Sequence, residues 1–254
     1  MNLLDIVGPV MVGPSSSHTA GAVKIGLVSR KLMGEKITNA EIYFHGSFLS
    51  TGKGHGTDKA ILAGLLGYGV DDPVIPHSFE AAQKEGLHYT MNGIDLGEVH
   101  PNSVKMYLTG ESGKKLEIVA ASIGGGRIQI CELDGLTANF SGDYPTLIVH
   151  NVDQPGHVTE VTSMLAHKSV NIATMQLYRK SRGGDADDIA NAAALALKSL
   201  LGLACDPVAG LVEVPCVKRN VLGAVNAVSF ATIFNRKRRI VLRSTGGHTV
   251  PVLV

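Results

Sequence analysis

The chain has 254 residues, of which 44% are hydrophobic and 18% are charged, and its formal net charge is +1. This composition is typical of a globular protein with one or two domains and argues against a disordered chain. A net charge so close to zero gives no electrostatic reason to expect nucleic acid or an anionic membrane surface as a partner.

The N-terminus and the apolar runs indicate where the protein works. Residues 1–5 contain Asp5 and no basic residue, so we expect no signal peptide. The longest apolar run, Ala192 to Ala204, is interrupted by Lys198 and is too short to cross a bilayer. Three cysteines without a signal peptide favour the reducing cytoplasm over a disulfide framework.

Residues 8–21 are rich in small and polar side chains and precede a segment with helical periodicity, Ala22 to Leu32. Ser17 or Thr19 is expected to cap this helix, which leaves free backbone N–H groups around Ser15 to Thr19. A helix N-terminus of this kind attracts a carboxylate or a phosphate. An ordinary capped helix without a ligand explains the pattern equally well.

The segment Thr38 to Phe44 alternates apolar and polar residues, which predicts a half-buried strand. It is followed by a glycine-rich loop, residues 46–56, that contains Lys53 and His55. Glycines allow a backbone to approach a ligand closely. A P-loop is excluded, because no Ser or Thr follows Lys53 at the required position.

A second helix is expected directly after this loop. Thr57 or Asp58 would cap it, and it would run through Leu66 to Gly67. A histidine held between a strand and a helix, as His55 is, is a candidate general acid or base. The alternative is a flexible loop with a solvated histidine.

Short elements follow in quick succession. We expect a short helix around Glu80–Glu85, then a polar hairpin around Met91–Ile94. Three strands come next, separated by glycine-containing turns: Val104–Leu108, Leu116–Ala121 and Ile128–Glu132. Cys131 falls on the polar face of the last strand, where we assign it no role.

A linker at residues 142–145 precedes a new unit. The unit has strand Thr146–Val152, a helix to about His167 and strand Asn171–Lys180. This pattern resembles the first half of an ACT regulatory domain, which usually runs βαββαβ. An apolar helix, Ile189–Leu201, is expected where the second half would begin.

Cys205 and Cys216 enclose a segment that Pro207 and Pro215 make stiff. A stiff loop with a thiol at each end suits a metal site, since metal ligands must be held at fixed separation. The spacing is wider than in most zinc sites, and two buried cysteines acting as small hydrophobic residues are the alternative.

The amino-acid sequences of several segments resemble those of the iron–sulfur-dependent L-serine dehydratases. CDPVAGLVEVPCVKRN resembles the cluster-binding loop of their α part, over about residues 188–229. GPSSSHTAG, KGHGTDKA, HPNS (residues 100–103) and GGGR (residues 124–127) resemble their β part. The resemblance implies a [4Fe-4S] cluster held by three cysteines. Cys205 and Cys216 match the last two, and the glycine-rich segment that carries the first in the family is not found in this chain.

The resemblance also implies an activity, the deamination of L-serine to pyruvate and ammonia, without pyridoxal phosphate. The open iron would act as a Lewis acid on the serine hydroxyl. His55 is the first candidate for the base that removes the α-proton, and His18 is the second. The candidate substrate-binding residues are Ser15, Ser16, Ser17, Thr19, Lys53, Thr57 and Asn102. On sequence grounds alone, Asn102 is part of a Pro-Asn turn.

The expected fold class is α+β. The expected parts are a β-like domain (1–142), a partial ACT-like βαβ unit (146–186), a short helical cluster-loop fragment of the α part (187–230) and a tail (231–254) in which we recognise no family pattern. A basic run in this tail is expected to be solvated. We expect an α chain of the same enzyme or a second copy as partner.

Two other functions remain open. The β-like domain resembles the allosteric substrate-binding domain of certain D-3-phosphoglycerate dehydrogenases, so the chain could be a regulatory module that binds a small amino acid or anion. It could also be an inactive, truncated product.

Overall fold

The computed structural model describes residues 9–144, 146–152, 155–167 and 170–179, and the backbone of four further strands between residues 185 and 252. The chain divides into two compact units, Met1–Gly142 and Asp143–Val254. Helices and strands are mixed in the described residues, which confirms the α+β class.

The first unit is built on one open sheet of six strands in the order β2-β1-β3-β4-β5-β6. The strands are β1 (Ile37–Phe44), β2 (His88–Gly93), β3 (Ser103–Gly110), β4 (Lys115–Gly124), β5 (Arg127–Leu133) and β6 (Leu136–Phe140). β1 and β2 pair in parallel and the other neighbours are antiparallel. The parallel pair is possible because a long helical segment connects β1 to β2.

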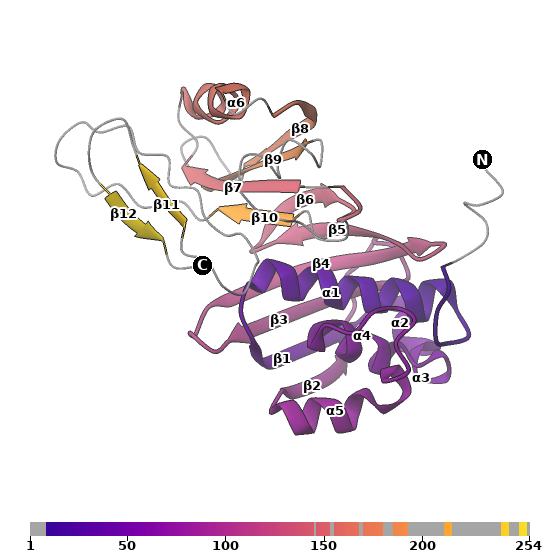
Figure 1. The fold of residues 1–254 in the computed structure, drawn as a ribbon. Helices are drawn as coiled ribbons and strands as arrows, with labels where there is room; N and C mark the ends of the chain where they lie inside the picture. The colour runs from indigo at the N-terminus through magenta and orange to yellow at the C-terminus, as the bar shows by residue number, and fades with distance from the viewer. Residues whose placement is uncertain are drawn as a thin grey trace. The chain divides into compact units, whose positions relative to one another are not determined.

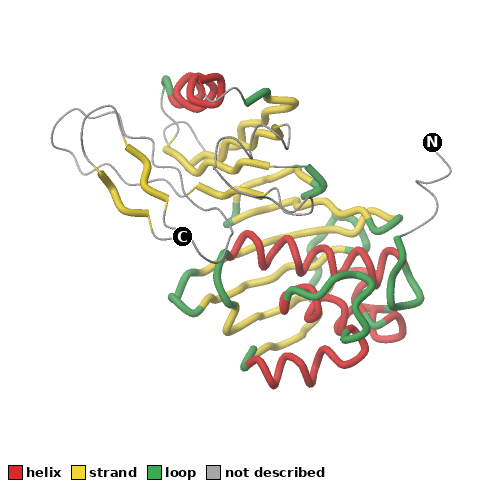
Figure 2. The backbone as a smooth tube through the Cα atoms, in the orientation of Figure 1, coloured by secondary structure: helices red, strands yellow, loops and turns green. Residues whose placement is uncertain are grey.

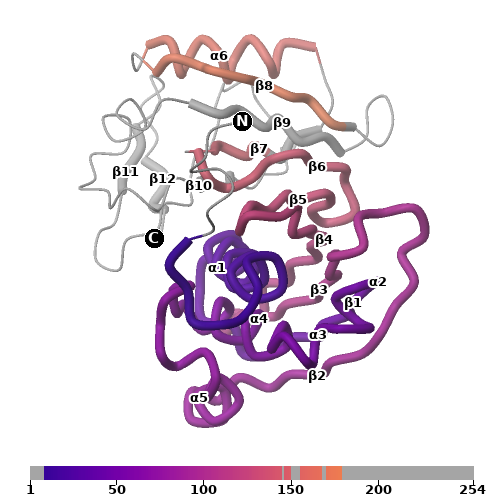
Figure 3. Tube along the Cα trace, turned by 90° about the vertical axis from the view of Figure 1, so that its right-hand side faces the viewer, coloured from indigo at the N-terminus to yellow at the C-terminus, as the bar shows by residue number. Residues whose placement is uncertain are grey.

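The helices of this unit come from two stretches of the chain. They are the π-helix η2 (Ser16–Gly21), α1 (Ala22–Met33), α2 (Gly46–Ser50), α3 (Gly52–His55), α4 (Thr57–Leu66), the 3₁₀ turn η3 (Ile75–His77) and α5 (Ser78–Glu85). α1 and α4 lie on one face of the sheet (Figures 1 and 3), in front of the strands in the view of Figure 2.

The core lies between the sheet and these helices. Ile42, Met106, Ile118 and Leu133 form one row across four strands, and all four are fully buried. Alternate residues point to the other face, which is partly exposed and more polar. This alternation explains why the strands could be predicted from sequence.

Two expectations for this unit are corrected. The hairpin expected around Met91–Ile94 is wrong, because residues through Gly93 belong to the single edge strand β2 and pair with β1. The Asn92-Gly93 pair therefore lies in a ladder and makes no turn. β6 was not anticipated. The three strands expected between residues 104 and 132 are confirmed as β3, β4 and β5, each slightly longer than expected.

The second unit contains a four-stranded sheet in the order β10-β7-β9-β8. Its elements are β7 (Thr146–Val152), α6 (His157–His167), β8 (Ile172–Arg179), β9 (Asp185–Ala192) and β10 (Leu211–Val214). β9 pairs antiparallel with both β7 and β8, so β7–α6–β8 is a split β-α-β unit with β9 inserted. A separate antiparallel pair is formed by β11 (Ile240–Arg243) and β12 (Thr249–Val252).

The strand, helix and strand expected between residues 146 and 180 are confirmed. The helix expected over Ile189–Leu201 is wrong at its start, since residues 189–192 belong to β9. Pairing with two neighbours overrides the helix preference of this alanine-rich segment. β9 and β10 also extend the sheet beyond the half unit that was expected. Residues 193–201, Cys205 and Cys216 lie outside the described residues.

Candidate functional site

The first turn of η2 is held by Ser15. Its backbone is extended and its side-chain oxygen accepts a hydrogen bond from the His18 N–H at 3.1 Å. The expected caps, Ser17 and Thr19, are therefore wrong: the helix starts earlier and both lie inside it. His18 and Thr19 follow in η2, and both residues are buried.

The His18 side chain contacts two aromatic rings and two hydroxyl groups. The residue is 9% exposed, and its ring meets Phe48 edge-on at 5.2 Å between centroids and lies 4.8 Å from the ring of His55. Its Nε2 atom is 3.0 Å from Thr51 Oγ1 and 3.2 Å from Ser47 Oγ. The two histidines named as candidate bases from the sequence are thus packed against each other.

Burial lowers the pKa of His18 below its usual range, because the charged ring loses hydration. A hydrogen bond at Ser47 acts in the opposite direction and the nearby His55 ring adds to the lowering. The His18 imidazole is therefore held in its neutral form near pH 7. A neutral imidazole can accept a proton.

His55 is anchored by the backbone of the preceding turn. Its Nδ1 atom is 3.0 Å from the carbonyl oxygen of Thr51, and its own carbonyl accepts a hydrogen bond from Thr19 Oγ1 at 3.2 Å. A carbonyl oxygen can only accept, so His55 Nδ1 carries the proton and Nε2 is left free. His55 is half-buried.

The segment between β1 and α4 is helical, where a glycine-rich loop was expected. The expected cap, Thr57 or Asp58, is also corrected: α4 follows Gly56, whose φ of 69° is a left-handed conformation that favours glycine. The helix does run from Thr57 to Leu66 and end at Gly67, as expected.

A loop from a distant part of the chain fixes α2. Ser47 N donates to the carbonyl of Pro101 at 2.7 Å, and a Cβ on Gly46 would lie 2.6 Å from the same oxygen. Gly46 also has a φ of 54°. The hydrogen bond to Pro101 and the tight backbone at Gly46 set the position of Ser47. They therefore also help to place the Ser47 and Thr51 hydroxyls, which face His18.

Asn102 joins this loop to β4. Its Nδ2 donates to the Ser122 carbonyl at 3.4 Å and the Ser122 N–H donates to the Asn102 carbonyl at 2.9 Å. Ser122 packs against Gly21 in η2, and Gly126 packs against Pro9 and Ala20. All four segments that resemble the β part of serine dehydratases therefore meet around η2.

The remaining predicted substrate-binding residues differ in their placement. Ser16 and Ser17 are half-buried in the first turn of η2, whereas Lys53 is exposed on α3. Thr57 is fully buried, and its Oγ1 has no hydrogen-bond partner, a property shared by Ser122 Oγ and Ser78 Oγ among the described residues. The structure thus brings Ser15–Thr19, His55 and Thr57 together and leaves the Lys53 side chain at the surface.

Ser47 and Thr51 were missed by the sequence interpretation. The signal was present in their spacing: residues four apart share one face of a helix. It was overlooked because the surrounding glycines and serines favour a loop.

The described residues contain no set of three or more His, Cys, Asp or Glu that could hold a metal ion. Cys131 is a free thiol, and burial raises its pKa, followed by the effect of the Glu132 charge. A raised pKa disfavours the thiolate, which is the form that binds metal. Within the described part of the chain, no helix is long and apolar enough to span a membrane.

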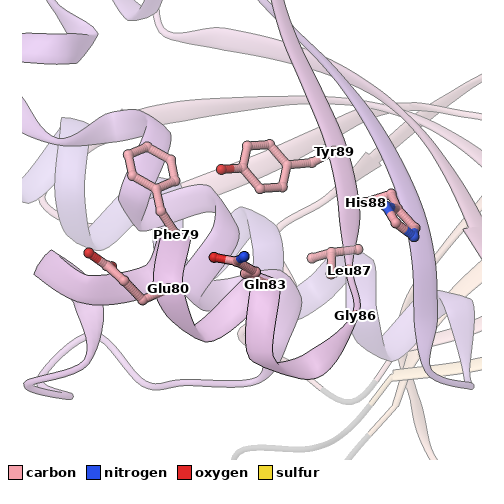
Figure 4. Close-up of a pocket in the computed structure, with 7 residues that line it drawn as sticks. All are labelled: Phe79, Glu80, Gln83, Gly86, Leu87, His88 and Tyr89. Carbon is pink, nitrogen blue, oxygen red and sulfur yellow. The ribbon is translucent and has the colours of Figure 1, made fainter.

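A shallow hollow of about 550 Å³ lies elsewhere, between α5 and β2. In Figure 4, Phe79 and Gln83 project from α5 beside Tyr89 of β2, and the Phe79 and Tyr89 rings stack at 5.9 Å. It shares no residue with the histidine site.

Comparison with known proteins gives two family matches. The family described as "Serine dehydratase beta chain" matches residues 3–91, and "Serine dehydratase alpha chain" matches residues 173–251. The second match reaches into the tail, where no family pattern was recognised from the sequence. The first match contains His18 and His55, and the second contains Cys205 and Cys216.

Individual relatives agree with these matches. The probable L-serine dehydratase beta chain of Bacillus subtilis is 42% identical over 182 residues, which are 72% of this chain and 82% of that protein. The L-serine dehydratase beta chain of Peptoniphilus asaccharolyticus is 41% identical over 172 residues, 67% of this chain and 78% of that protein. A probable alpha chain from Latilactobacillus sakei is 60% identical over 52 residues, 20% of this chain and 25% of that protein.

Proposed function

The chain belongs to the L-serine dehydratase family, and we propose that it takes part in the deamination of L-serine to pyruvate and ammonia. The observation that carries this proposal is the pair of histidine rings in contact in η2 and α3, with ring centroids 4.8 Å apart and ring planes tilted by 36°. Around them gather the segments of residues 15–19, 46–57 and 101–102. The pair combines a basic ring atom with nearby hydroxyls and with the first turn of η2, whose leading N–H groups have no partner within a helix.

We assign His55 as the base that removes the α-proton of serine. Its Nδ1 proton is held by the Thr51 carbonyl, so Nε2 presents a lone pair. His55 is also less buried than His18, which favours access by a substrate. Since a general base must reach its proton directly or through one water, an accessible ring atom is required. His18 remains the second candidate.

The serine carboxylate would bind at the start of η2. The backbone N–H groups of a first helical turn have no partner within the helix and favour an anion. Ser15 already satisfies one of them, at His18. Ser16 and Ser17 would complete the site, with Thr57 and Asn102 at its border. Thr19 would support the site from within, because its N–H donates to the Ser15 carbonyl at 2.9 Å and its hydroxyl donates to the His55 carbonyl at 3.2 Å. Lys53, which is exposed, would contribute a positive charge at the entrance rather than a buried contact.

A cluster of the kind implied by the resemblance would supply a Lewis acid for the departing hydroxyl group. The described residues offer no donor set for it. The roles of the histidines and of η2 above do not depend on it. Because relatives of this chain include separate alpha and beta chains, we propose that a complete α chain is the partner.

The proposal is tested by pyruvate formation in an anaerobic mixture of this chain with a complete α chain of the family. His55→Ala should lower turnover by at least about 10²-fold, the usual effect of losing a general base. His88→Ala, at an exposed position of β2, is the matched control and should keep full turnover. Wild-type turnover in His55→Ala would remove His55 from the mechanism. No pyruvate from a wild-type mixture that carries an intact cluster would overturn the activity.

A further inference from the structure

Thr51 contacts both histidines of the site through different atoms. Its hydroxyl oxygen lies 3.0 Å from His18 Nε2, and its carbonyl oxygen lies 3.0 Å from His55 Nδ1. Thr51 is also the residue that joins α2 to α3, so its position is fixed by both helices. One residue between two short helices thus touches both rings.

The hydroxyl of Thr51 has one proton, and a backbone carbonyl, which can only accept, lies within hydrogen-bond distance of it. Thr51 Oγ1 donates to the carbonyl of Ser47, one turn earlier in α2, at 2.9 Å. With its proton used there, the oxygen can only accept from His18. His18 Nε2 must then carry a proton, and Nδ1 is the unprotonated atom of the neutral ring.

Ser47 is compatible with a hydrogen bond donated by His18 Nε2 to Thr51 Oγ1, but it does not determine which of the two atoms is the donor. Its Oγ lies 3.2 Å from His18 Nε2 and 3.3 Å from Thr51 Oγ1. Among the described residues, the Ser47 hydroxyl makes its hydrogen bonds to His18 and Thr51 and to no carbonyl, so it can donate to Thr51 while its oxygen faces the His18 N–H. The single Nε2 proton of His18 is then shared between the Thr51 and Ser47 oxygens, with Thr51 the nearer acceptor.

We propose that Thr51 is a positioning residue that fixes the proton on Nε2 of His18 and on Nδ1 of His55. The two rings therefore present opposite nitrogens as lone pairs: Nδ1 of His18 and Nε2 of His55. This inference rests on the proposed function only for its effect on turnover, because the proton positions can be measured without substrate.

The primary test is ¹⁵N NMR of the full chain labelled in histidine, near pH 7.5, where the ring nitrogen shifts report which atom is protonated. The His18 signals are assigned with His18→Gln. In the wild type, His18 should be protonated at Nε2. Thr51→Val removes the hydroxyl but keeps the carbonyl, so it should shift the His18 proton partly to Nδ1 and leave His55 unchanged. His55 thus serves as an internal control in the same sample.

Two variants separate the hydroxyl from its surroundings. Thr51→Ser restores the acceptor and should restore the wild-type His18 signals. Ser47→Ala keeps both the Ser47 carbonyl and the Thr51 hydroxyl, so it should leave the His18 proton on Nε2. A wild-type His18 protonated at Nδ1, or unchanged His18 signals in Thr51→Val, would overturn the proposal.

Turnover is the secondary readout, measured in the mixture with an α chain. Thr51→Val should lower turnover about tenfold or more, and Thr51→Ser should recover it, because a histidine in the wrong tautomer cannot give or take the proton it faces. Expected NMR shifts with unchanged turnover would uphold the role of Thr51 and remove His18 from the proposed mechanism. The two proposals can therefore fail separately.

Discussion

The burial of His18 has a consequence for stability, because its pKa is lowered in the folded chain. In the unfolded chain its pKa is about 6.5. Between that pH and the lower folded pKa, the unfolded state binds more protons, so the free energy of unfolding increases with pH in this range. The contribution of neutral His18 is complete above about pH 6.5 and is lost as the pH falls through the folded pKa.

We therefore expect acidification to destabilise the wild type more than a variant without this group. Urea unfolding of wild type, His18→Gln and the exposed control His88→Gln at about pH 7.5 and about pH 5.5 checks this. The loss of unfolding free energy between the two pH values should be smaller for His18→Gln than for the other two proteins. Equal losses in all three proteins would show that His18 titrates normally.

At this scale, sequence reasoning found the residue types but missed their partners. Two polar, glycine-containing segments that each precede an apolar helix stand out in the sequence. They contain the serines around Ser15 with His18, and His55. Ser47 and Thr51 do not stand out, because their role depends on α2 being helical and on Pro101 fixing it from a distant position. The cap was expected at Ser17 or Thr19, later in the chain than the observed cap, Ser15. Composition alone does not distinguish Ser15 from Ser16 and Ser17.

Among the elements, α1 and α4 approach each other so closely that their backbones are in contact. Gly26 and Gly64 meet where the helices cross, and a Cβ on Gly64 would lie 2.8 Å from the Cα of Gly26 and 2.9 Å from the backbone N of Leu27. The obstruction is backbone, which cannot move aside like a flexible side chain. α1 follows η2 directly and α4 follows α3, so this crossing also sets the separation of His18 and His55.

Gly64→Ala should therefore lower the free energy of unfolding by about 1–3 kcal/mol, the usual cost of overpacking. This cost exceeds the gain of roughly 1 kcal/mol that Ala brings inside a helix. The matched control is Gly54→Ala in α3, where a Cβ would meet no atom within 4 Å. Gly54→Ala should be neutral or slightly stabilising. Urea unfolding measures both, and equal stability of the two variants would contradict close backbone contact at Gly64.

Strands with a clear alternation were predictable, and strands defined by their partners were not. β1 and β3 alternate buried residues with partly exposed ones over most of their length. The edge strand β2 is mostly exposed and polar, so its parallel pairing with β1 leaves no pattern in the sequence. β9 is alanine-rich and reads as a helix, yet it pairs on both sides. Such long-range pairing cannot be inferred from local preference.

For the molecule as a whole, the chain joins a β-chain match over residues 3–91 to an α-chain match over residues 173–251. The candidate site that can be built from described residues lies entirely in the first unit. The cysteines that resemble cluster ligands, Cys205 and Cys216, belong to the second match and lie outside the described residues. The residues proposed to position the substrate and the cysteines that resemble cluster ligands thus fall in different parts of one sequence.

The cysteine inventory leads to the last prediction. Clusters of this type are held by cysteine thiolates, and the resemblance implies three, of which Cys205 and Cys216 are two. The third cysteine of the chain, Cys131, has a raised pKa and lies in β5 of the first unit. A thiol of this kind is a poor ligand. We therefore expect the chain alone, reconstituted anaerobically with iron and sulfide, to hold much less than one [4Fe-4S] cluster and to form little pyruvate.

Iron and sulfide analysis with a pyruvate assay measures both quantities, before and after a complete α chain is added. The α chain should raise both, and Cys131→Ser should change neither, because Cys131 is expected to play no part in ligation. A stoichiometric, active cluster in the isolated chain that Cys131→Ser abolishes would contradict this and make Cys131 the third ligand. In that case the first unit would contribute to the cluster as well as to the substrate site, and the α chain would not be needed to complete it.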